Sequence, residues 1–147
     1  MNNSFFQWNS YFIDEKVNFL KFENEYKVFN ESGEQIGAVN QKLNTGQKFL
    51  RIVLNKAMLP FRLEFINADG MVEASISRGW TFFMSKIRVA DENGNNIALV
   101  KQKFKFFKPT FRIFDISNML IAEITGDWKA WNFMIKDANG SEIGTIS

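Results

Sequence analysis

Five stretches of the chain repeat one pattern of apolar and polar positions. Each copy begins with alternating apolar and polar residues, has Asp or Asn at its fifth position, and ends in a short apolar run. The copies are Tyr26–Val39, Leu63–Ile76, Ile87–Val100, Phe111–Ile124 and Phe133–Ile146. Alternation with a period of two is typical of a β-strand with one buried face. Each copy therefore predicts a β-hairpin, two strands joined by a turn at its centre.

The centre of each copy consists of turn-forming residues. The fifth position holds an acid or its amide, namely Asn30, Asn67, Asp91, Asp115 and Asp137. The eighth position is Gly33, Gly70, Gly94 and Gly140, with Asn118 in the fourth copy. Asp and Asn side chains accept hydrogen bonds from nearby backbone N–H groups, and Gly or Asn tolerates the left-handed conformation. We interpret the five acid or amide residues as turn formers rather than as calcium ligands.

The twelfth position of every copy is small, and we interpret it through packing. Its residues are Gly37, Ala74, Ala98, Ala122 and Gly144. A small side chain lets a strand bend or lets a bulky aromatic residue lie across it.

The segments between the copies also lack helical periodicity, so we expect an all-β protein. Two of them, Ser77–Lys86 and Lys101–Thr110, are short and aromatic, whereas Asn40–Arg62 is longer and could hold an extra strand or one helical turn. Strands in this order predict a single domain over residues 1–147, whose first part, 1–13, is an N-terminal arm. Its expected architecture is an antiparallel meander that closes into a barrel.

The composition narrows the chemistry. The chain has no His and no Cys, which excludes His- or Cys-based nucleophilic catalysis, thiol redox chemistry and zinc sites of those ligands. No GxGxxG or GK[ST] phosphate loop is present, and the carboxylate pairs Asp14–Glu15 and Glu23 with Glu25 are best explained as surface charge. We therefore expect no enzyme, no catalytic residue, no metal and no cofactor. The absence of a signal peptide or long apolar run predicts a cytoplasmic protein, with peripheral association with a membrane as the alternative.

The hairpin pattern, followed by the Lys-rich stretch Lys101–Ile113, resembles the LURP-one-related and phospholipid-scramblase-like proteins of the Tubby C-terminal-like superfamily. The opening Ser10–Gly37 is similar to the start of the bacterial scramblase-related members. The resemblance extends from about Tyr11 to Ser147. It implies a twelve-stranded antiparallel barrel around a central apolar helix, and a tendency to bind lipid.

No sufficiently apolar helix is visible in this sequence, so the resemblance leaves three alternatives. The chain could be a shortened version of a longer family member. The barrel could be smaller, partly open or flattened, with Phe and Trp filling it. The N-terminal arm could also plug the barrel, since Phe5, Trp8 and Phe12 share one helical stripe. We expect a collapsed or partly open barrel.

The candidate binding site is a run of cations without an acid among them. Its residues are Lys101, Lys103, Lys105, Lys108 and Arg112. Strand alternation puts Lys101, Lys103 and Lys105 on one face, suited to an anionic lipid headgroup. The plainer interpretation, which we give more weight, is a solvated strand face whose lysines discourage edge pairing. In the same way Trp80, Phe82, Phe83, Trp128 and Trp131 could anchor at a membrane but are more often core residues.

These observations predict a non-enzymatic, scramblase-like domain that binds anionic phospholipid or a membrane surface through its Lys-rich strand. A second hypothesis is a structural domain that recruits a protein partner, or another copy of itself, at an open strand edge. A nucleic-acid partner is less favoured, because the net charge is only +2.

Overall fold

The computed structural model describes residues 4–14, 25–42, 60–79, 86–103, 110–127, 130 and 132–147. These residues form one sheet of eleven antiparallel strands in sequence order, β1 to β11. A single 3-10 turn, η1 (Phe5–Gln7), precedes them. The strands are β1 (Phe12–Asp14), β2 (Glu25–Phe29), β3 (Gln35–Lys42), β4 (Phe61–Asn67), β5 (Val72–Arg78), β6 (Lys86–Asp91), β7 (Asn96–Lys103), β8 (Thr110–Asp115), β9 (Leu120–Asp127), β10 (Asn132–Asp137) and β11 (Glu142–Ile146).

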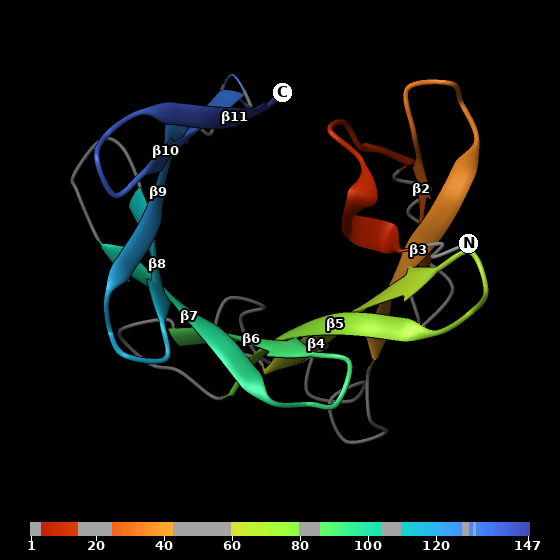
Figure 1. Ribbon diagram of the computed structural model, residues 1–147, viewed down its shortest axis with the longest axis horizontal. Helices are drawn as coiled ribbons and strands as arrows, with labels where there is room; N and C mark the ends of the chain where they lie inside the picture. The colour runs from red at the N-terminus through yellow and green to blue at the C-terminus, as the bar shows by residue number, and fades with distance from the viewer. Residues whose placement is uncertain are drawn as a thin grey trace, which may run out of the picture.

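The sheet curls into an open shell (Figure 1). β2 and β11 lie on opposite sides of an opening, and the hydrogen-bonded order of the sheet runs from β1 to β11 without joining its two ends. The predicted all-β meander is confirmed, and among the described residues the barrel is open rather than closed. The extra strand or helical turn predicted within 43–59 lies outside the described residues.

All five copies of the repeat fold as the predicted hairpins, β2–β3, β4–β5, β6–β7, β8–β9 and β10–β11. In each copy the first position pairs with the fourteenth and the third pairs with the twelfth. After the third position the register shifts by one residue in all five copies, which leaves the eleventh position as the extra residue of a β-bulge. A bulge increases the local twist of a strand, so its repetition helps the sheet to curl.

The turns are built by the acid or amide at the fifth position of each copy. Its Oδ1 accepts hydrogen bonds of 2.9–3.0 Å from the backbone N–H groups two and four residues on. Its carbonyl oxygen accepts from the N–H of the eighth position, at 3.0–3.1 Å. That eighth residue is left-handed in every copy, for example Gly70 at φ 81° and Asn118 at φ 63°. The interpretation of the five residues as turn formers is confirmed.

The concave face of the shell is apolar. Paired residues of an antiparallel sheet share a face, so the first, third, twelfth and fourteenth positions of each copy lie together. Phe65 belongs to this face and packs edge-to-face on Phe5 at 5.6 Å between ring centroids. Figure 1 shows η1, which carries Phe5, inside the curve of the sheet. The main cluster of buried residues therefore lies on the β2–β4 side, where its members are Phe5, Val28, Ile36 and Val39. Later strands also contain buried apolar residues, namely Ala74, Ala90, Ala122 and Phe133.

The N-terminal arm enters the shell as one short turn. Glu73 accepts hydrogen bonds from the Ser4 hydroxyl (3.0 Å) and from the Phe5 N–H (2.8 Å), which fixes the turn against β5. Phe5 is buried, but Trp8 is 36 % exposed, and Phe12 is 58 % exposed on β1. The helical stripe of Phe5, Trp8 and Phe12 is therefore wrong. The 3-10 turn ends at Gln7, and only Phe5 of the three fills the shell.

The small residue at the twelfth position acts as predicted in the first copy. A Cβ on Gly37 would overlap the carbonyl oxygen of Ile66 and come within 2.8 Å of the Phe5 ring. Glycine thus lets an aromatic side chain lie directly on the strand. At the equivalent Gly144, the nearest atom to such a Cβ would be Ile135 Cδ1 at 3.5 Å, which is an ordinary contact.

Candidate functional site

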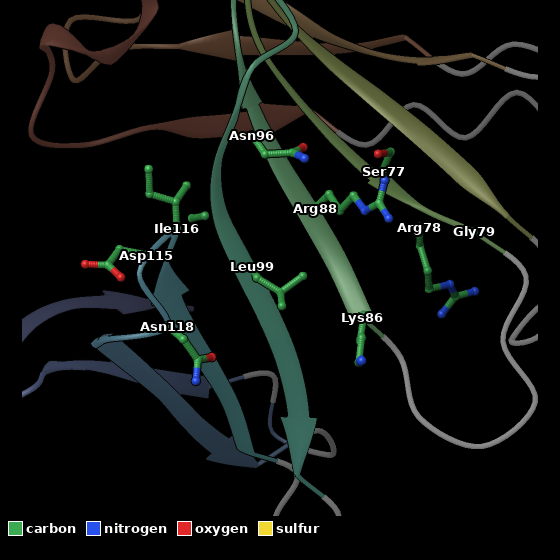
Figure 2. Close-up of a pocket in the computed structure, with 11 residues that line it drawn as sticks. Ser77, Arg78, Gly79, Lys86, Arg88, Asn96, Leu99, Asp115, Ile116 and Asn118 are labelled. Atoms are coloured by element: carbon green, nitrogen blue, oxygen red, sulfur yellow. The ribbon is translucent and has the colours of Figure 1, made fainter.

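A broad depression crosses the sheet at β5–β8 (Figure 2). Its volume is about 990 Å³, and Figure 2 shows its side chains coming from the end of β5, from β6 and β7, and from the β8–β9 turn. One side of it holds the cations Arg78 and Lys86, and the other holds Asp115 and Asn118. The residues that line the depression are Ser77, Arg78, Gly79, Lys86, Arg88, Asn96, Ala98, Leu99, Asp115, Ile116 and Asn118.

The register of the strands places a row of cations beside this depression. Lys86 on β6 pairs directly with Lys101 on β7, and Lys101 pairs directly with Arg112 on β8. All three side chains leave the sheet on the face opposite Phe65, because their neighbours along each strand belong to the apolar concave face. Arg88 lies two residues along β6 on the same face. Residues directly opposite each other have Cβ atoms about 5 Å apart, and like charges at that distance are destabilising.

Few carboxylates neutralise this row. Arg112 Nε lies 2.9 Å from Glu123 Oε2, its direct partner on β9. Among the described residues, Lys86, Arg88 and Lys101 have no carboxylate within ion-pair distance. The arrangement therefore concentrates positive charge on one face of β6–β8.

Lys101 is held by uncharged partners. Its Nζ donates a 3.1 Å hydrogen bond to Asn118 Oδ1 and lies 4.6 Å from the centroid of the Phe114 ring. Asn118 takes the left-handed position of the β8–β9 turn, where its N–H donates to the Asp115 carbonyl. Both contacts orient the ammonium group without cancelling its charge, so it remains available to an anion.

Arg78 completes the cationic end of the depression. It is the last residue of β5, and its guanidinium carbon lies 4.9 Å from the centroid of the Phe61 ring. Partial burial lowers the pKa of Arg78, yet an arginine remains protonated at neutral pH. Arg78, Lys86 and Arg88 line the same depression as one carboxylate, Asp115.

The structure brings together part of the predicted site and adds to it. Lys101 and Arg112 are adjacent, and Lys103 lies on β7 opposite Thr110. Lys105 and Lys108 lie outside the described residues, as do the aromatic residues Trp80, Phe82, Phe83, Trp128 and Trp131. Sequence reasoning missed Lys86 and Arg88 as neighbours of Lys101 on one face of the sheet, and Arg78 as a further cation that lines the depression. The hairpin pattern contained the signal, because pairing Ile87 with Val100 also pairs Lys86 with Lys101.

The Asp carboxylates at the fifth position of the turns accept hydrogen bonds from backbone N–H groups of the same turn. The N–H of Asn95 holds the pKa of Asp91 below its usual range, helped by the Asn95 side chain and the N–H groups of Asn93 and Gly94 and opposed by desolvation. In the part of the chain that the structure describes, no three His, Cys, Asp or Glu residues group as metal ligands would. Within the same residues, no helix has the length and apolar character needed to cross a bilayer.

Comparison with known proteins identifies the family to which the chain belongs. No curated protein and no solved structure shows significant similarity to the chain. The family model of the scramblases, in contrast, matches residues 13–147, which include every strand after the first residue of β1. The chain that forms this open shell and its cationic surface therefore belongs to the scramblase family.

Proposed function

We propose that this domain is non-enzymatic and binds anionic phospholipids at a membrane surface through the row Lys86, Lys101 and Arg112 and the cationic end of the adjacent depression. The observation that carries the proposal is the direct pairing of these three cations, with one ion-paired carboxylate among them. Such a row lowers the stability of the free sheet, and a bound phosphate relieves the repulsion. Membership of the scramblase family supports a lipid ligand.

The expected strength follows from the number of unneutralised cations. Each Lys or Arg close to an anionic membrane contributes about 1 kcal/mol, and the effect disappears within a Debye length of roughly 8 Å at physiological salt. Lys86, Arg88 and Lys101 together would then contribute about 3 kcal/mol, or a factor of roughly 100 in partitioning.

Co-sedimentation with vesicles tests the proposal. Vesicles of phosphatidylcholine with about 25 % phosphatidylserine should pellet the protein at low salt, whereas pure phosphatidylcholine should not. The double variant Lys86→Gln with Lys101→Gln should lower the partition coefficient by about 10- to 30-fold. The matched control, Lys27→Gln with Lys136→Gln, removes the same charge from exposed positions on β2 and β10 and should change binding far less.

Two outcomes would contradict the lipid proposal. One is an absence of binding to the anionic vesicles at low salt. The other is an equal loss in both double variants, which would mean that only total charge matters. A salt-dependent rise in fluorescence anisotropy with single-stranded DNA, without vesicle binding, would instead identify a nucleic-acid partner.

A specific observation also favours the second hypothesis, recruitment of a protein at a strand edge. Among the described residues, β1 pairs only with β2 and β11 pairs only with β10. Edge strands present unpaired backbone groups to other chains, and Ile143 and Ile146 on β11 are 60 % and 41 % exposed. Sedimentation velocity at increasing concentration tests self-association: it should show a dimer that Ile143→Lys weakens. A strictly monomeric protein would count against pairing between copies.

A further inference from the structure

Charge is segregated along the strand direction of the shell. In an antiparallel meander the hairpin turns all lie at one end of the strands, here named the turn end. The connections between hairpins join the strands at the other end, here named the connection end. The five turns, 30–34, 67–71, 91–95, 115–119 and 137–141, contain no Lys or Arg. Their carboxylates are Glu31, Glu34, Asp69, Asp91, Glu92, Asp115 and Asp137.

The connection end has the opposite charge. The last two residues of the strands at this end include the cations Lys42, Arg62, Arg78, Lys86 and Lys103. Their acidic counterparts at the same strand ends are Asp14, Glu25 and Asp127. Lys42 and Arg62 share a single carboxylate, Glu64, at 4.0 and 3.2 Å. Positive charge therefore exceeds negative charge at this end, although the whole chain carries a net charge of only +2.

The depression described above extends across the strands and contains residues from both ends of them. Figure 2 shows Arg78, Gly79 and Lys86 at one end of it and Asp115, Ile116 and Asn118 at the other. Its cationic end coincides with the connection ends of β5 and β6, and its acidic end coincides with the β8–β9 turn. An anionic headgroup would thus enter the depression from the connection end.

We propose that this charge separation orients the protein on an anionic bilayer, with the connection end against the headgroups and the turn end directed away from them. The inference rests on the proposed lipid binding and adds the surface that makes the contact. A separation of charge over a whole molecule steers and orients it in an external field even when the net charge is small. The negative potential of the bilayer attracts one end and repels the other.

The strongest competing orientation uses the exposed apolar residues of the turns. Met71, Ile116 and Met119 are 61 %, 78 % and 65 % exposed, and such side chains could insert between lipids. Ile116 follows Asp115 directly, and Met71 lies two residues from Asp69. Insertion would bring these carboxylates against anionic headgroups, so we favour the connection end.

Single cysteines carrying an environment-sensitive fluorophore test the orientation, and the natural chain has no Cys to interfere. Gly79→Cys and Ala130→Cys place the label at the connection end. Both residues are exposed, and a side chain at Gly79 meets no atom within 4 Å. Ser32→Cys and Asn93→Cys place it in exposed turns, where the native residues donate only backbone N–H groups to the Asx oxygens. All four variants are mixed with the same phosphatidylserine-containing vesicles.

Labels at 79 and 130 should shift to shorter wavelength on binding and be quenched by a lipid-bound nitroxide, while labels at 32 and 93 should not respond. Vesicle binding with an equal response from all four labels, or a response only at 32 and 93, would overturn the orientation but leave the proposed function intact. If every variant and the unlabelled protein failed to pellet with the vesicles, both the orientation and the proposed lipid binding would be contradicted.

Discussion

At the level of single residues, the choice between Asp and Asn at the fifth position follows the neighbouring charge. Asn30 Nδ2 donates to Glu34 at 3.1 Å, and Asn67 Nδ2 donates to Glu73 at 2.9 Å. Asp91, in contrast, accepts from the Asn95 amide at 3.2 Å. Either residue can build the turn, but an amide stands where the second side-chain atom faces a carboxylate. At Asp91 the carboxylate faces an amide, so in all three of these turns the choice avoids two adjacent negative charges.

The substitution Asn67→Asp should therefore destabilise the protein near pH 7. It keeps the oxygen that accepts from Asp69 and Met71 but replaces the donor to Glu73 with a second carboxylate. Loss of this part-buried hydrogen bond costs about 1–3 kcal/mol. The new carboxyl group would have a raised pKa in the folded state, so acidification should reduce the deficit. Urea denaturation at pH 7 and pH 4 measures both effects, and a deficit independent of pH would contradict the explanation.

The substitution Asp91→Asn should keep the turn but change the acid response. Hydrogen bonds lower the pKa of Asp91 in the folded state, so its contribution to stability is present above the unfolded pKa. That contribution is lost as the pH falls through the folded pKa. Thermal unfolding should therefore show the melting temperature of the natural protein falling toward that of the Asn variant below about pH 4. Asp91→Ala, which removes the acceptor oxygens, should be less stable than both at every pH. A difference in melting temperature between the natural protein and Asp91→Asn that does not change with pH would contradict the explanation.

At the level of the hairpin, the repeat determines much of the local structure. The alternation of apolar residues predicts both strands, and Asx with Gly predicts the turn between them. The register follows, because the turn brings the first position opposite the fourteenth. The bulge at the eleventh position does not follow from the pattern. The sequence does not show whether an Ile in a predicted strand, such as Ile97, pairs with the neighbouring strand or is the extra residue of a bulge.

Glycine at the twelfth position gives a comparison within one repeat. Gly37→Ala should be strongly destabilising, because its Cβ would meet the rigid carbonyl of Ile66 as well as the Phe5 ring. Overpacking of this kind typically costs about 1–3 kcal/mol. Gly144→Ala has ordinary contacts and should be neutral to within roughly 0.5 kcal/mol. Equilibrium unfolding of the two variants decides the point, and equal destabilisation would show that the close contact at Gly37 is unimportant.

At the level of the whole molecule, the repeat predicts an all-β meander, and the family resemblance together with the missing apolar helix predicts an open or collapsed barrel. Neither predicts what occupies it. The position of Phe5 could not be predicted, because its burial depends on Glu73, a residue distant in sequence that accepts hydrogen bonds from Ser4 and Phe5. The candidate site was visible only in part for the same reason. A run of cations in β7–β8 is apparent from the sequence, whereas Lys86 and Arg88 join it only when strand pairing is known.

The uneven core predicts uneven stability. Phe5, Val28, Ile36 and Val39 are buried on the β2–β4 side, whereas Ile97, Ile121 and Ile143, at the same repeat position as Ile36, are 48 %, 45 % and 60 % exposed. Opening reactions are easiest where little apolar surface is buried. Backbone amides of β3 and β4 should therefore exchange hydrogen most slowly, and those of β10 and β11 faster.

Phe5→Ala tests the cause of this difference. Removing a buried Phe costs about 3–5 kcal/mol when its site stays formed, and less when the surrounding segment detaches. Because the Phe5 side chain packs with residues of β2, β3 and β4, its loss should accelerate exchange in these strands and leave β8–β10 nearly unchanged. Phe12→Ala, at an exposed position of the same arm, is the control. Acceleration spread evenly over all strands would show that the sheet opens as one cooperative unit, independent of where its core lies.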